Sequence, residues 1–194
     1  MSGQAVGTGD PYAGPDEVTL VSRAQDGDLV AFEQLVDRYE SRLLGLCIRM
    51  LRNRVDAEDI VQDTFLTTWR RLDSLQNPAA FKSWIFRLAS NACLDFLRRR
   101  EVRRTDAVDP GDMVEQSATG PSVEDRAETS AAVRELDRVL ETLSPEQRIA
   151  WLLYEIEGQS YAEIADVLGV TEGSVRGRIH RARLAIVEGM KGWA

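Results

Sequence analysis

The chain has 194 residues, of which 43% are hydrophobic and 29% charged, and its formal net charge is −8 at pH 7. This apolar content is sufficient for one ordinary domain or two small ones, and it excludes wholesale disorder. No run of about 18 apolar residues is present, and the first residues lack the basic and apolar regions of a secretory signal. We therefore expect a cytoplasmic protein with no direct insertion into the membrane.

The charges are unevenly distributed. Residues 1–17 hold three acidic residues and no basic one, and residues 105–128 hold seven acidic residues and one basic residue. The rest of the chain is close to neutral, and its arginines cluster at residues 98–104 and 176–183. Because clustered arginine is typical of phosphate binding, the acidic total does not exclude a nucleic-acid partner.

Cysteine and histidine give little sign of reactive chemistry. Cys47 and Cys93 each lie in an apolar stretch with helical spacing, without a CxxC or Cys/His ligand pattern. This pattern favours two reduced, mostly buried thiols, with a redox sensor or metal site as the minor alternative. The single histidine, His180, cannot form a metal site or a catalytic dyad by itself. We expect no catalytic residue, no metal and no cofactor.

Four zones follow from composition. Residues 1–17 are rich in Gly, Pro and small polar residues and are expected to form a disordered tail. Residues 18–104 and 129–194 carry apolar residues at helical spacing, without the alternation typical of strands. Residues 105–128 are acidic and lack aromatic residues, so they indicate a flexible linker. The sequence therefore predicts an all-α protein in which a flexible acidic linker joins two small helical domains.

Breaks near residues 53–55 and 73–78 divide the first helical zone. The helices are expected to resume at Asp56 and at about Ala79. The last of them ends in the arginine cluster.

The second helical zone carries stronger local signals. Ser144 with Gln147, and Ser160 with Glu163, have the spacing of capping boxes at helix N-termini. Gly169 suits the end of a helix because a glycine adopts positive φ at little cost, and Thr171 can cap the next helix. A helix, a tight glycine turn and a second helix are the pattern of a helix-turn-helix motif.

The last helix, from residue 171 onward, is predicted to contact duplex DNA. Its apolar residues Val175, Ile179, Ala182 and Ile186 share one side, which is expected to pack on the preceding helices. The other sides carry the candidate DNA-binding residues Ser174, Arg176, Gly177, Arg178, His180 and Arg181. Arginine suits guanine edges and phosphates because its guanidinium donates two parallel hydrogen bonds.

Several stretches resemble the extracytoplasmic-function (ECF) subfamily of RNA polymerase sigma factors. They are AFEQLVDRYESRLLGLC, DAEDIVQDTFLTTWRRLDSL, AFKSWIFRLASNACLDFLRRR and LSPEQRIAWLLYEIEGQSYAEIADVLGVTEGSVRGRIHRARLAI. The resemblance covers roughly residues 20–104 and 130–190, in the family's order and with an acidic linker between. Gly177 and His180 depart from the family pattern, which often has Ser and an aromatic residue there.

The resemblance implies that residues 18–104 are sigma region 2, which binds core RNA polymerase and the −10 element. It implies that residues 129–194 are sigma region 4, which binds the −35 element. Core binding is then expected from Asp59, Gln62, Asp63 and Phe65. Contact with the melted −10 DNA is expected from Asn77, Trp84, Asn91, Arg98, Arg99, Arg100 and Arg103. Trp84 is expected to be mainly a core residue, since aromatic side chains at this spacing usually are.

The resemblance also implies partners beyond core polymerase and promoter DNA. Sigma factors of this type are commonly inhibited by an anti-sigma factor, so one is expected here. In the family the linker threads through the polymerase toward the RNA exit path, and a plain solubilising tether is an equally open reading of residues 105–128.

Two other functions would fit parts of the sequence. A stand-alone helix-turn-helix regulator would explain residues 144–186 but not residues 18–104. A nuclease would need a carboxylate cluster or an activated nucleophile, and only Asp56, Glu58, Asp59 and Asp63 are dense enough to suggest one. The resulting hypothesis is a sigma factor that is not itself an enzyme.

Overall fold

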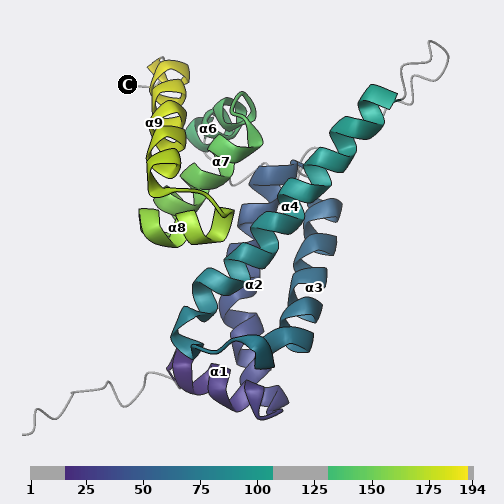
Figure 1. The fold of residues 1–194 in the computed structure, drawn as a ribbon. Helices are drawn as coiled ribbons and strands as arrows, with labels where there is room; N and C mark the ends of the chain where they lie inside the picture. The colour runs from purple at the N-terminus through teal and green to yellow at the C-terminus, as the bar shows by residue number, and fades with distance from the viewer. Residues whose placement is uncertain (1–15, 107–130, 192–194) are drawn as a thin grey trace, which may run out of the picture.

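The computed structural model describes residues 16–106 and 131–191, and both parts are helical (Figure 1). Neither described range contains a strand, so the all-α prediction is confirmed. Nearly all of the predicted tail and most of the predicted linker lie outside the described residues. The first helix begins at Glu17, the last residue of the predicted tail. The helix that precedes the predicted linker continues to Asp106, two residues into that linker.

The N-terminal domain is built from four helices. They are α1 (Glu17–Gln25), α2 (Leu29–Leu51), α3 (Arg54–Arg71) and α4 (Phe81–Asp106), with the short 3-10 turns η1 (Leu72–Ser74) and η2 (Pro78–Ala80) before α4. Asp16, Asp28 and Asn53 begin the first three helices by accepting hydrogen bonds from backbone N–H groups of the first turn. The α3 helix therefore starts two residues before the predicted Asp56, since Asn53 supplies the cap.

The core of this domain lies between α2, α3 and α4. Tyr39 on α2 packs edge-on against Phe81 and Phe86 of α4, with ring centroids 5.4 and 6.2 Å apart. The Tyr39 hydroxyl donates to the Glu17 carboxylate of α1, so the first helix is tied to the same centre. Burial is the main reason that the pKa of Tyr39 is raised.

The C-terminal domain consists of α6 (Ala131–Glu141), α7 (Pro145–Trp151), the π-helical turn η3 (Leu152–Ile156), α8 (Tyr161–Leu168) and α9 (Glu172–Gly189). Both predicted capping boxes are present, at Ser144 and Ser160. Gly169 ends α8 with φ of 63°, and Thr171 caps α9, as predicted. The helix-turn-helix is therefore formed by α8 and α9.

The two domains are packed together. In Figure 1 the C-terminal helices lie beside α2 and α4, and contacts join α7 to both of these helices and α8 to α4. The buried guanidinium of Arg148 on α7 donates to the carbonyls of Met50, Glu141 and Leu143 at 3.0, 3.1 and 3.3 Å. Burial lowers the pKa of Arg148. One arginine thus joins the end of α2 to the end of α6.

The two cysteines lie across the N-terminal core from each other. Cys47 on α2 and Cys93 on α4 are fully buried, with their Sγ atoms 3.6 Å apart. The pKa of Cys93 is raised, first by its hydrogen bond with Cys47 and then by burial. Both features disfavour the thiolate, which is the reactive form.

Replacing Gly169 with alanine is expected to lower the free energy of unfolding by about 1 kcal/mol, because a Cβ disfavours positive φ. Urea denaturation followed by circular dichroism measures the change. Gly173→Ala is the matched control: this glycine is helical and a Cβ would meet only Thr171 Oγ1 at 3.9 Å. The control is expected to be neutral or stabilising, and equal destabilisation by both variants would contradict the role given to the turn.

A charged thiol reagent is expected to leave Cys47 and Cys93 unmodified in the native protein and to modify both in denaturant. The physical reason is full burial of both side chains and the raised pKa of Cys93. Mass spectrometry of the intact protein counts the adducts. Rapid labelling of the native chain would revive the redox-sensor alternative.

Candidate nucleic-acid interface

The α9 helix presents a buried side to its own domain and an exposed side to solvent. Val175, Ile179 and Ala182 are at most 1% exposed, which confirms the predicted apolar stripe for these three residues. Of the predicted DNA-binding residues, Arg176, His180 and Arg181 are exposed, and Ser174, Gly177 and Arg178 are half-buried. The Thr171 cap and the packing of the buried side therefore fix α9 in place, and α9 carries these candidate residues.

Arg181 lies over Gly177, one turn earlier on α9. A Cβ built at Gly177 would be 3.4 Å from the Arg181 Nη1 atom, which is at the short end of van der Waals contact. Glycine at this position leaves room for the guanidinium to lie close to the helix backbone. Sequence spacing placed Gly177 on the exposed side but could not reveal this contact.

Two tyrosines and two arginines form a column beside the helix-turn-helix. The rings of Tyr154 and Tyr161 stack with centroids 4.9 Å apart and an interplanar angle of 12°. Arg176 lies over Tyr161 at 5.4 Å, and Arg183 lies over Tyr154 at 5.1 Å, measured to the ring centroids. We call Arg176, Tyr161, Tyr154 and Arg183 the aromatic column.

A carboxylate also contacts each arginine of the column. Arg176 Nη2 is 3.1 Å from Glu172 Oε2, and Arg183 is 2.8 Å from Glu155 Oε1. The hydrogen bond to Glu155 is the largest cause of a raised pKa at Arg183. Arg183 was not among the predicted DNA-binding residues, although its position seven residues after Arg176 places both on one side of α9.

The exposed side of α3 carries a mostly acidic strip. Asp59, Gln62 and Asp63 are exposed, whereas Phe65 is half-buried and packs against the core. Leu66 is 52% exposed. It follows Gln62 by four residues and Asp63 by three, so it lies next to them on the helix surface. Leu66 therefore adds an exposed apolar residue to this surface beside half-buried Phe65, whose part in core binding stays a prediction.

The predicted −10 residues spread along η2 and the whole length of α4. Asn77 is exposed and caps η2 through its side-chain oxygen, which accepts from the Ala79 N–H at 3.1 Å. Asn91 is exposed, and Trp84 is half-buried against Phe81 with ring centroids 6.2 Å apart.

Of the arginines near the end of α4, Arg98, Arg99 and Arg103 are exposed, and Arg100 is half-buried. Arg98 pairs with Asp95 at 2.8 Å. The arginines extend this surface beyond the domain core.

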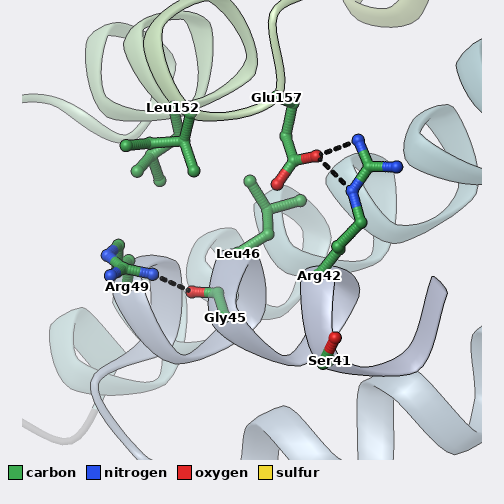
Figure 2. A pocket seen from close by; sticks show the side chains of 8 residues that line it. Ser41, Arg42, Gly45, Leu46, Arg49, Leu152 and Glu157 are labelled. Carbon is green, nitrogen blue, oxygen red and sulfur yellow. Dashed lines mark hydrogen bonds and ion pairs between the residues drawn. The ribbon is translucent and has the colours of Figure 1, made fainter. Parts of the chain in front are cut away.

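A pocket of about 250 Å³ lies between the domains (Figure 2). Its lining residues are Ser41, Arg42, Gly45, Leu46, Arg49, Leu152, Ile156 and Glu157. The Glu157 carboxylate is 5% exposed and accepts from Arg42 Nη2 and Nε at 2.6 and 3.0 Å. Figure 2 shows this pair at one end of the pocket, with Arg49 turned back to the Gly45 carbonyl.

The described residues contain no group of three or more His, Cys, Asp or Glu side chains placed to hold a metal ion. This part of the chain includes the α3 carboxylates on which a nuclease would depend. In the same ranges no helix is long and apolar enough to cross a membrane.

Comparison with known proteins agrees with this arrangement. Residues 35–103 match Sigma-70 region 2, and residues 133–186 match Sigma-70, region 4. The chain is 33% identical over 170 residues to the ECF RNA polymerase sigma-E factor of Haemophilus influenzae, covering 84% of this chain and 89% of that protein. It is 39% identical over 153 residues to ECF RNA polymerase sigma factor SigE of Mycolicibacterium smegmatis, covering 79% of this chain but only 59% of that longer relative.

Two solved structures have the same fold. CnrH, in complex with the cytosolic domain of CnrY, aligns with a TM-score of 0.67 at 27% identity, over 92% of this chain and 99% of that chain. The sigma factor RpoE of Bartonella quintana, in complex with the anti-sigma factor NepR, aligns with a TM-score of 0.69 at 28% identity, over 84% and 98%. The chain described here therefore belongs to the ECF sigma factors of RNA polymerase.

Proposed function

We propose that this sigma factor divides promoter recognition between three surfaces of its two domains. The acidic strip of α3 binds core RNA polymerase, η2 and α4 hold the melted −10 element, and α9 reads the −35 element. The observation that carries the proposal is the exposed arginine side of α9, on a helix that is capped by Thr171 and packed through Val175 and Ile179. The polymerase supplies the chemistry of RNA synthesis, and this chain supplies the selection of its start.

The α9 surface suits a major groove. Arg176 and Arg181 are exposed and can donate two parallel hydrogen bonds to a guanine edge, while Arg178 suits a phosphate beside it. Gly177 leaves room for the Arg181 guanidinium beside the helix backbone, so Arg181 can present its donors close to the helix axis. His180 lies on the same exposed side and adds a further hydrogen-bonding group.

The region 2 surfaces suit a protein partner and unpaired DNA. Asp59 and Asp63 offer carboxylates to basic groups of core polymerase, and Leu66 adds an apolar contact next to Asp63. On α4, exposed Asn91 can pair with a base edge, and the arginines of residues 98–103 can hold phosphates of the opened strand. Trapping unpaired bases offsets the cost of opening the duplex, which is a few kcal/mol per base.

An anti-sigma factor is proposed as the regulator. The two solved relatives are both in complexes: CnrH with the cytosolic domain of CnrY, and RpoE with the anti-sigma factor NepR. A cytoplasmic location fits a partner of core polymerase and DNA. Purification of the tagged chain from its own cells is expected to yield an inhibitory protein, and recovery of core polymerase alone would count against this partner.

The first test is run-off transcription from fragmented genomic DNA with core RNA polymerase, with and without the protein. Sequencing is expected to find new RNA 5′ ends that share an upstream two-part motif. If no new starts occur and the protein binds duplex DNA alone, the stand-alone regulator becomes the better explanation.

The double variant Arg176→Ala/Arg181→Ala is expected to lower promoter affinity of the holoenzyme by at least tenfold while core binding stays unchanged, because each bidentate contact contributes about 1–3 kcal/mol. Fluorescence anisotropy with promoter DNA and with core polymerase measures the two affinities. Arg138→Ala is the matched control, since Arg138 is an exposed arginine of the same domain on α6. Equal loss of core binding would refute the division between the domains.

A further inference from the structure

We propose that Tyr161 and Tyr154 are positioning residues for promoter binding, which hold Arg176 and Arg183 of α9 ready for the −35 DNA. This inference rests on the proposed function of α9. It adds two residues outside the recognition helix, and it adds Arg183 as a phosphate-binding residue. The evidence is the aromatic column, in which the two rings stack on each other and each ring contacts one guanidinium group.

The backbone before the helix-turn-helix places Tyr154. Residues Leu152–Ile156 form a π-helical turn, closed by a hydrogen bond from the Glu157 N–H to the Leu152 carbonyl at 3.1 Å. Such turns insert one extra residue into a helix and are frequent at functional sites. Tyr154 lies in the middle of this turn, and its ring meets that of Tyr161, the first residue of α8.

The column lowers the cost of binding. A free arginine side chain loses up to about 2 kcal/mol of rotamer entropy when it is fixed on DNA. A guanidinium that already rests on an aromatic ring and beside a carboxylate has lost part of that freedom before binding. Arg176 and Arg183 remain about half exposed or more, at 62% and 46%, so each keeps donors available for DNA.

The test is promoter binding by the reconstituted holoenzyme. Tyr161→Leu is expected to weaken binding about three- to tenfold, whereas Tyr161→Phe, which keeps the ring, is expected to change it less than twofold. In an Arg176→Ala background, Tyr161→Leu is expected to have no further effect, because the arginine that the ring positions is gone.

The same double-mutant comparison is made with Tyr154→Leu and Arg183→Ala. Arg183→Ala is also expected to lower the salt dependence of promoter binding by about one phosphate contact. Equal losses from Tyr161→Leu in both backgrounds would overturn the positioning role, because a purely structural effect is additive. If Arg176→Ala itself leaves binding unchanged while Tyr161→Leu weakens it, the assignment of Arg176 to the −35 element fails instead. Circular dichroism confirms that each variant is folded.

Discussion

A buried guanidinium at the domain boundary is the constraint around which the two halves of this protein are arranged. The side chain of Arg148 is buried, and burial disfavours its charged form and lowers its pKa. A buried charge is tolerated only where it is paired or well hydrogen-bonded. The three carbonyls around Arg148 lie at or just after the ends of α2 and α6, where helix dipoles favour a positive charge.

This arrangement ties the fold of region 4 to region 2. Removal of Arg148 would leave carbonyls at the end of α2 without this donor, while removal of its partners would leave a buried charge uncompensated. Around it, Arg42, Lys82 and Arg87 of the N-terminal domain meet a carboxylate or a carbonyl of the other domain. Polar contacts therefore lie at the boundary, and beneath them the buried apolar residues of both domains form one hydrophobic cluster.

Local chemistry explains why much of the fold could be predicted. Ser144, Ser160, Gly169 and Thr171 act through residues no more than a few positions away, so their roles as caps and turn are visible in the sequence. The apolar stripe of α9 follows from helical periodicity for the same reason. The helical zone predicted from residue 18 contains nearly all of α1, but the break at residues 26–28 that separates α1 from α2 was not predicted.

The features that escaped prediction depend on contacts distant in sequence or on an irregular backbone. Arg42 and Glu157 are 115 residues apart, and no local pattern pairs them. Tyr154, which stacks on Tyr161, lies in a π-helical turn, and regular helical periodicity does not predict such a turn. Phe65 and Leu66 are adjacent apolar residues on α3, and only packing decides that Phe65 faces the core.

The arginines explain how an acidic chain can serve as a DNA-binding protein. The arginines at the domain boundary donate hydrogen bonds to carbonyls and to Glu157 of the same chain. Those of α9 are held beside rings and carboxylates but stay exposed, so their charge is presented at one surface instead of being averaged over the chain. Repulsion between DNA and the acidic remainder falls off within about 8–10 Å at physiological salt, whereas guanidinium groups in the groove act at contact distance. The position of charge on α9, rather than the net charge of −8, therefore decides what this surface can bind.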